Sequence, residues 1–453
     1  MANSLDYPCE HANTVSQAAR GGSGGTGRQT RSILGGSLPE EALPQENSSM
    51  PTAIRTSGTI RLASILLAAG LMAAFTLGCQ NSSKAGARSD NSGNTISTRP
   101  DEALLDALER EYAIGPRAAR SLGYRLGWQV PDAGTDTVDI SPQDDSVFIR
   151  SNTNILERLT ADTGTRLWST SIGSPVAEVL GITYMPEKQL IYITRDSSML
   201  SIRSGTGVMT STPVQSLQWI ANTGPALYEN YLIYGSRAGE LVWQAYEIGH
   251  SYRAYKIGQA IKLKPQLQGD IIVAVANSGE IVAINTETVS KVWGHQLLDQ
   301  IVAEPAVGPT AAYVASRDQY LRAFDLFSGR VLWKSMTESS LSDSPTVDGR
   351  QVYQQVPGVG LTCYEAMPGN RFDGRRLWVC PQITGNVITT RGDRLITWDD
   401  DTSQLGLVSK KTGTLEKTMS LKDVRLLIAD DLNEGRLYTL DNRGRLDCLI
   451  PLN

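Results

Sequence analysis

Short apolar runs alternate with polar turns throughout residues 122–453, and the pattern recurs with a period of about 40 residues. In the clearest copies a run ends in a turn that contains glycine, and tryptophan follows that glycine after four residues, as in Gly164 with Trp168 and Gly329 with Trp333. Each period also contains a second apolar run with a turn rich in Gly and Asn, the residues that tight hairpins favour. Two hairpins per period predict four strands, and such a repeat is typical of a β-propeller blade.

The number of strands predicts an eight-bladed ring. Eight strand triplets follow residue 138, and the last repeat stops after its third strand, at residues 446–449. A lone strand at residues 124–129 carries Trp128, 40 residues before Trp168. We therefore predict an all-β fold over residues 122–453 in which this N-terminal strand closes the eighth blade and removes the free edge of the ring. The tryptophans of the repeat are interpreted as packing residues: Trp128, Trp168, Trp293, Trp333 and Trp378.

The chain before the ring has the composition of a secretion signal and a linker. Residues 50–79 begin with a basic segment, continue with the uncharged run 62–77 and end in Gly-Cys, which predicts a signal peptide. Residues 80–100 are polar and are interpreted as a linker. Residues 1–49 are rich in Gly, Ser, Asn and Gln, and we expect them to be disordered or to be an upstream extension from a mis-assigned start codon.

The end of the signal resembles the lipobox of bacterial lipoproteins. Residues 76–79 read Thr-Leu-Gly-Cys, and the resemblance implies that Cys79 carries the lipid and anchors the protein to a membrane in an extracytoplasmic compartment. Gln80 follows the cysteine in place of the Asp that retains lipoproteins in the inner membrane, which favours the outer membrane. The alternative is that residues 62–77 stay uncleaved as an anchor helix.

A short helical segment is predicted between the linker and the ring. Within residues 101–121, the apolar residues Leu104, Leu105, Leu108 and Tyr112 recur at helical spacing. We expect one short amphipathic helix that packs on the ring. Pairing with a partner protein is the alternative use of its apolar face.

The composition argues against several classes of partner and of active site. The chain has 453 residues with 42 basic and 47 acidic side chains, a net charge of −5, and this balance argues against nucleic acid as a partner. Five cysteines, none adjacent, and three histidines cannot form the common zinc spacings, and no phosphate loop or nucleophile elbow is present. The acidic run 399–401 is interpreted as a solvated hairpin turn. We predict no cofactor, no metal and no catalytic residue.

The sequence does not decide whether two of the cysteines form a disulfide. Cys363 and Cys380 fall on neighbouring strands, but the expected register places Cys363 opposite Trp378 and Cys380 opposite Leu361. The thiols are then two residues out of register, and only a bulge would bring them together.

Aromatic residues are concentrated in residues 218–255, where eight occur. One interpretation is that the third blade presents aromatic side chains to a protein partner, because Tyr and Trp are enriched at interface hot spots. The alternative is that they fill the space between blades where the repeat lacks tryptophan, at Ser211 and Arg253. The residues proposed for the partner surface are Trp219, Tyr234, Trp243 and Tyr252.

The repeat at residues 161–168 and 323–333 resembles that of the pyrroloquinoline quinone-like family of β-propellers, with Ala, Asp, Thr or Ser, Gly and Trp in order. The family includes quinone-dependent alcohol dehydrogenases, sensor domains and the propeller lipoprotein of the outer-membrane β-barrel assembly machinery. The dehydrogenases would require an adjacent cysteine pair, calcium ligands and long insertions, which this chain lacks. The resemblance therefore implies a non-catalytic lipoprotein scaffold for protein–protein interaction, with barrel-assembly components as partners. A stand-alone secreted binding or sensor propeller is the alternative, and a quinone-dependent dehydrogenase is a third reading.

Overall fold

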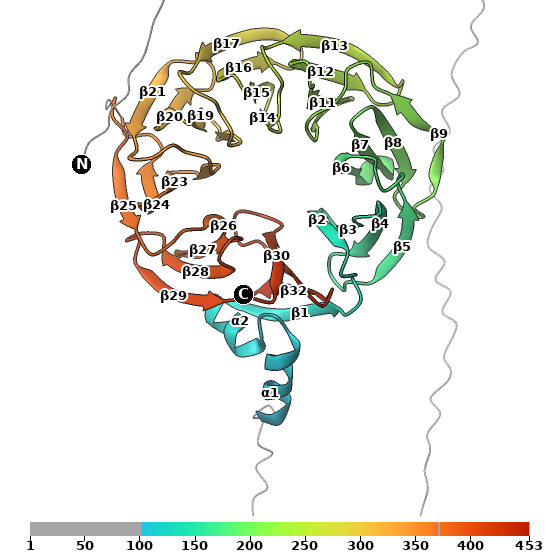
Figure 1. Ribbon diagram of the computed structural model, residues 1–453, viewed down its shortest axis with the longest axis vertical. Helices are drawn as coiled ribbons and strands as arrows, with labels where there is room; N and C mark the ends of the chain where they lie inside the picture. The colour runs from blue at the N-terminus through green and yellow to red at the C-terminus, as the bar shows by residue number, and fades with distance from the viewer. Residues whose placement is uncertain (1–101, 370–371, 453) are drawn as a thin grey trace, which may run out of the picture. The chain divides into compact units, whose positions relative to one another are not determined.

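The computed structural model describes residues 102–369 and 372–452, which form eight four-stranded antiparallel sheets arranged as blades around a central channel (Figure 1). The eight-bladed ring predicted from the sequence is confirmed. The segments predicted for residues 1–100, Cys79 included, lie outside the described residues. Within the described ranges, no helix is both long and apolar enough to cross a membrane.

The first four blades run from the innermost to the outermost strand in chain order. Blade 1 contains β2 (Thr137–Gln143), β3 (Ser146–Ser151), β4 (Ile155–Thr160) and β5 (Arg166–Ser171). Blade 2 contains β6 (Val179–Met185), β7 (Leu190–Arg195), β8 (Ser198–Arg203) and β9 (Met209–Ser216), with a short 3-10 turn at Pro186–Lys188. Blade 3 contains β10 (Ala226–Tyr228), β11 (Tyr231–Gly235), β12 (Glu240–Ala245) and β13 (His250–Lys256). Blade 4 contains β14 (Gln266–Gln268), β15 (Ile271–Val275), β16 (Glu280–Asn285) and β17 (Ser290–Gln296).

The next three blades repeat this order, and the eighth draws its outer strand from the start of the ring. Blade 5 contains β18 (Ala306–Val307), β19 (Ala311–Ala315), β20 (Tyr320–Asp325) and β21 (Val331–Met336). Blade 6 contains β22 (Thr346–Asp348), β23 (Gln351–Val356), β24 (Gly360–Glu365) and β25 (Arg376–Cys380). Blade 7 contains β26 (Asn386–Arg391), β27 (Arg394–Asp399), β28 (Gln404–Ser409) and β29 (Leu415–Ser420). Blade 8 contains β30 (Val424–Ala429), β31 (Leu437–Asp441), β32 (Leu446–Pro451) and β1 (Tyr124–Val130).

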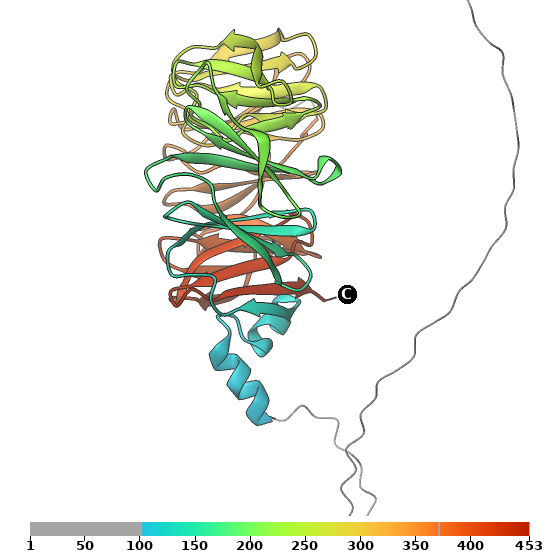
Figure 2. The same ribbon diagram turned by 90° about the vertical axis from the view of Figure 1, so that its right-hand side faces the viewer.

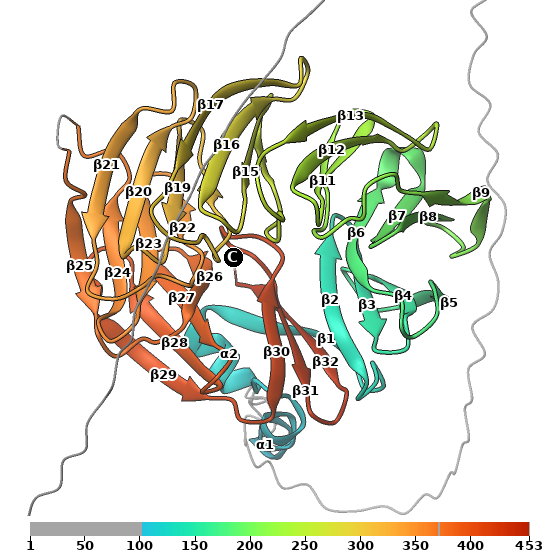
Figure 3. The ribbon, with the colours of Figure 1, turned by 45° about the horizontal axis from the view of Figure 1, so that its top comes forward.

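The eighth blade joins the two ends of the propeller. β1 pairs antiparallel with β32, from Tyr124 opposite Pro451 to Val130 opposite Leu446. A bulge between Leu126 and Trp128 shifts the register by one residue. Figure 3 shows β1 and β32 side by side, so strands from the two ends of the propeller complete the closing blade.

The core lies between the blades. The second and third strands of a blade are buried on both faces, as in β15, where all five residues are buried, because a neighbouring blade covers each face of the sheet. One core cluster joins Val273 of blade 4 to Val314 and Phe324 of blade 5, with Trp293 between them. The residues of the outer strands are instead mostly exposed or half-buried.

Two helices, not the single one predicted, precede the ring: α1 (Glu102–Glu111) and α2 (Pro116–Leu122). Gly115 has an extended backbone and Pro116 lacks an N–H group, so the first helix ends and a second begins with Pro at its first position. α2 packs its buried Leu122 against blades 7 and 8, whereas α1 has no buried residue and projects from the edge of the ring (Figure 2).

Candidate functional site

Tryptophan and glycine join neighbouring blades at the outer strand. The five repeat tryptophans are buried, and each indole Nε1 donates a hydrogen bond of 2.6–3.0 Å to a backbone carbonyl of the following blade. The turn of that following blade lies against the indole, since a Cβ atom on its glycine would come within 2.4–2.7 Å of the ring. The glycines are Gly164, Gly207, Gly329, Gly374 and Gly413. These tryptophans hold the blades together.

Other side chains make the same inter-blade bond where tryptophan is missing. In blade 2 the amide of Gln215 donates to the carbonyl of Tyr246, and in blade 3 the guanidinium of Arg253 donates to the carbonyl of Thr288 at 2.9 Å. Blade 7 differs, because Lys417 donates to the hydroxyl of Ser121 in α2 at 2.7 Å and so bonds the helical segment and not the next blade. Sequence analysis missed these substitutes, because polar side chains carry no packing signal of their own.

The aromatic surface predicted in blade 3 needs correction. Tyr234 and Trp243 are fully buried, because they lie on the second and third strands, which other blades cover on both faces. The Tyr234 hydroxyl donates to the carbonyl of Trp219, which is half-buried. Tyr252 on the outer strand is 53% exposed and packs on Tyr231, with ring centroids 5.3 Å apart. Only Trp219 and Tyr252 of the four proposed residues can reach a partner.

The cysteine register agrees with the predicted one, and Cys363 and Cys380 are free thiols. Cys363 lies opposite Trp378 and Cys380 opposite Leu361. A bulge is present between Cys363 and Tyr364, but it lies beyond the pair and does not bring the thiols together. Burial raises the pKa of Cys363 to about 12, so the thiol is neutral and unreactive at neutral pH.

The acidic run 399–401 begins at the end of β27 and continues into the turn before β28. Within the described ranges, no group of three His, Cys, Asp or Glu side chains is placed to hold a metal ion. The carboxylate of Asp399 is used within its own hairpin, where it accepts hydrogen bonds from the N–H groups of Asp401 and Thr402. His295 Nε2 is bonded to the carbonyl of Gly329 at 2.6 Å, and His250 is exposed.

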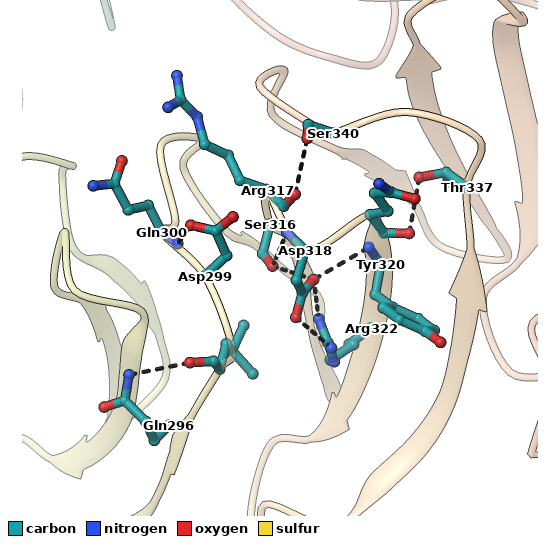
Figure 4. A network of polar contacts seen from close by, with 12 residues as sticks. Gln296, Asp299, Gln300, Ser316, Arg317, Asp318, Tyr320, Arg322, Thr337 and Ser340 are labelled. Atoms are coloured by element: carbon teal, nitrogen blue, oxygen red, sulfur yellow. Dashed lines mark hydrogen bonds and ion pairs between the residues drawn. The ribbon is translucent and has the colours of Figure 1, made fainter. Parts of the chain in front are cut away.

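One face of the ring, here called the loop face, carries the links from each outer strand to the next inner strand together with the turns between second and third strands. In blade 5 a buried ion pair fixes such a turn (Figure 4). Asp318 accepts hydrogen bonds from Arg322 at 2.6 and 2.8 Å, and from the backbone N–H of Tyr320. Burial alone would raise the pKa of Asp318, but the hydrogen bonds from Arg322 and Ser316 outweigh it and hold the pKa below its usual range.

Neighbouring links are hydrogen-bonded to this turn. The N–H of Arg317 donates to the carbonyl of Gln300 at 3.0 Å, and the hydroxyl of Ser340 donates to the carbonyl of Arg317 at 2.9 Å (Figure 4). Thr337 donates to the carbonyl of Gln319 from both its backbone and its side chain. Three successive segments of chain therefore form one connected, ordered surface.

Apolar side chains stand exposed on the loop face. Leu298 is 90% exposed and lies next to Asp299 in the link after blade 4. Arg317, on the turn that bonds this link, is exposed as well, and its side chain extends away from the network in Figure 4. Val176, in the corresponding link after blade 1, is 93% exposed. Leu298 was not predicted from the sequence. The signal that could have revealed it is the apolar pair Leu297 and Leu298, of which only Leu297 is buried.

The comparisons with known proteins agree with this geometry. A family model described as "Outer membrane protein assembly factor BamB" matches residues 229–379, which span blades 3 to 6. The chain is a β-propeller with PQQ-like repeats that resembles BamB.

Two solved structures share the fold at low sequence identity. The crystal structure of BamB from Moraxella catarrhalis is 19% identical with a TM-score of 0.56, and the match covers 69% of this chain and 94% of that one. The computationally designed Ika8 protein is 15% identical with a TM-score of 0.57, covering 72% of this chain and 99% of that one. No curated protein matches the sequence.

Proposed function

We propose that the chain is an extracytoplasmic lipoprotein scaffold that binds a protein partner through its loop face and acts in outer-membrane protein assembly. The family model that matches blades 3 to 6 is described as an assembly factor of this kind, which supports the choice of process. The predicted signal at residues 50–79 and its lipobox-like end at Cys79 support the proposed compartment and anchor.

The observation that carries the proposal is the exposure of Leu298 on an ordered loop. An isolated apolar residue on a surface needs no explanation, but Leu298 lies two residues before Gln300, whose carbonyl is bonded to the turn that the Asp318–Arg322 pair fixes. The exposed Arg317 lies on that turn. Arginine is enriched at interface hot spots, and an ordered loop loses little conformational freedom on binding. This arrangement suits recognition of a protein surface.

Leu298→Glu tests the proposed interface. The substitution places a charge where a partner would bury an apolar side chain, so recovery of barrel-assembly components with the purified protein from native membranes should fall about tenfold or more. Ile248→Glu is the matched control, because Ile248 is 71% exposed and lies on a turn between third and fourth strands, at the opposite face. Equal recovery with both variants would contradict the proposed surface.

Cys79→Ala tests the anchor independently. If Cys79 is acylated, the substitution should release the protein from the membrane fraction, because acyl chains provide the hydrophobic attachment. Unchanged membrane association would show that residues 62–77 or a partner hold the protein there.

A further inference from the structure

Four links on the loop face share one geometry at the mouth of the central channel. Each ends in a proline, and these prolines are 40 residues apart: Pro225, Pro265, Pro305 and Pro345. Their backbone bonds repeat as well, because the carbonyls of Ile220, Ala260 and Gln300 accept N–H bonds of 2.9–3.1 Å from Arg237, Asn277 and Arg317. The residues before the prolines can therefore be compared position by position.

A hydrogen bond connects two of these residues, Lys264 and Glu304, to the next blade. The N–H of Lys264 donates to Oε1 of Glu304 at 3.4 Å, and the N–H of Glu304 donates to the hydroxyl of Ser344 at 2.9 Å. The side chains before Pro305 and Pro345 thus accept the N–H of their counterparts in the preceding blades. For the N–H of Gly224 that side chain would be Lys264, which has no acceptor atom, and no described residue bonds this N–H instead.

Gly224 lines a hollow beside the inner strands β2 and β6. A cavity of about 360 Å³ is lined by Gly224, Lys262 and Lys264, and a second one of about 490 Å³ adjoins it and shares Lys264 and Ser141. Both lysines are exposed and form no ion pair with any described residue. The hydroxyl of Ser141 accepts a bond from Gln143 at 2.8 Å and keeps its own hydrogen free. The two ammonium groups, the Gly224 N–H and the Ser141 hydroxyl therefore give this hollow four hydrogen-bond donors without a partner among the described residues.

The acidic groups of the same hollow are already engaged. Glu304 accepts from the Lys264 N–H with one oxygen and from the amide of Gln266 at 3.2 Å with the other. Asp139 lies 3.8 Å from the guanidinium of Arg150. Neither carboxylate bonds the Gly224 N–H or the two ammonium groups.

We propose that this hollow binds a carboxylate group, which accepts the N–H of Gly224 and pairs with Lys264 and Lys262. The structure itself supplies the template, since the carboxylate of Glu304 occupies the equivalent place one blade further on. The carboxylate comes from an acidic peptide side chain or from a small carboxylic acid, and the site is independent of the interface at Leu298.

Lys264→Glu is the discriminating variant, because it gives the chain its own carboxylate at the vacant acceptor position. With the purified full-length protein at constant ionic strength, millimolar succinate or a short Glu-containing peptide should raise the melting temperature of the wild type. Lys264→Glu should melt higher than the wild type without ligand and should lose the response to both probes. Lys291→Glu, an exposed lysine on the outer strand β17, should keep the response.

The two probes distinguish the sources of the carboxylate. A response to the peptide alone assigns the site to an acidic protein segment, and a response to succinate assigns it to small carboxylic acids as well; either supports the site. Lys262→Gln should weaken the response without abolishing it. The proposal is overturned if neither probe shifts the wild type, or if Lys264→Glu responds as the wild type does.

Discussion

The glycine of the repeat turn has a positive φ and also lies against the tryptophan of the preceding blade. Gly164 has φ of +66°, and a Cβ atom there would lie 2.4 Å from the indole of Trp128 in the closing blade. Gly349 also has positive φ, +52°, but nothing lies within 4 Å of its Cβ position. Substitutions at the two glycines therefore distinguish the cost of positive φ from the cost of contact with the tryptophan.

Gly164→Ala should destabilise the ring more than Gly349→Ala. The backbone cost of positive φ is about 1 kcal/mol in both, and the clash with the indole adds about 1–3 kcal/mol in the first only. Urea denaturation of the two variants measures the difference. Equal losses would mean that the glycine is required by its turn and not by the tryptophan.

Asp318→Asn tests the ion pair that fixes the loop face in blade 5. The Asp318 side chain is 5% exposed and that of Arg322 is 11% exposed, so removing one charge leaves the other largely buried without its partner. A loss of about 3–5 kcal/mol is expected, whereas Asp299→Asn on the exposed neighbouring link should cost little. The double variant Asp318→Leu with Arg322→Met should recover much of the loss, because it leaves no unpaired charge.

The carboxylate of Asp318 also predicts how the stability of the fold changes at acidic pH. Because the folded-state pKa of Asp318 lies below the ordinary value of 3.8, its contribution is complete above that value and is lost as the pH falls through the folded pKa. The melting temperature of Asp318→Asn should therefore fall less than that of the wild type on acidification below about pH 4. Parallel curves would show that the pair does not stabilise the fold.

At the scale of the element, β1 is the closing strand, and its removal opens the ring. Deleting residues 124–130 leaves blade 8 with three strands and exposes the backbone N–H and C=O groups of β32 that β1 now pairs. We expect a much lower melting temperature and aggregation, measured by light scattering during thermal unfolding. An unchanged melting temperature would mean that β1 contributes nothing to closure.

Asp447 connects the helical segment to the closing blade. Its carboxylate is buried and accepts bonds from the N–H of Ala113 at 3.0 Å and from Gln129 at 2.8 Å. Burial raises the pKa of Asp447 above its ordinary value in spite of these bonds. The folded state therefore holds this proton more tightly than the unfolded state, and the stability from this group declines as the pH rises through that interval.

Asp447→Asn should remove this decline, because the amide stays neutral and keeps an acceptor for Ala113. Relative to the wild type, the variant should gain stability between about pH 4 and pH 7, as measured by thermal unfolding at both values. The exposed Asp423 offers a control, Asp423→Asn, that should follow the wild type. A constant difference between variant and wild type would refute the role of the buried charge.

The sequence predicted the ring and missed much of the surface, for identifiable physical reasons. The closing strand followed from the spacing of Trp128, because the inter-blade contact recurs once per repeat. Burial of Tyr234 and Trp243 did not follow, because strand alternation presumes one solvent-facing side and the blades cover both. Leu298 and the Gly224–Lys264 pair depend on which links meet in space, which no local pattern encodes.

At the scale of the whole molecule, repetition produces a rigid ring and departures from it mark the places that can bind. Tryptophans on the outer strands bond one blade to the next, and on the loop face the blade 5 turn is bonded to the links on either side of it. The departures are the exposed Leu298 and Lys264 at a position where the next two blades have acceptors. Both lie on the loop face.

The central claim is that the loop face binds a protein partner. A photoreactive amino acid at position 298 of the full-length protein, expressed in its native cells, tests this most directly, with position 248 on the opposite face as control. The account predicts a defined crosslinked product at position 298 that contains a component of outer-membrane protein assembly, and no such product at 248. Crosslinks of equal yield and composition at both positions, or none at 298, would contradict it.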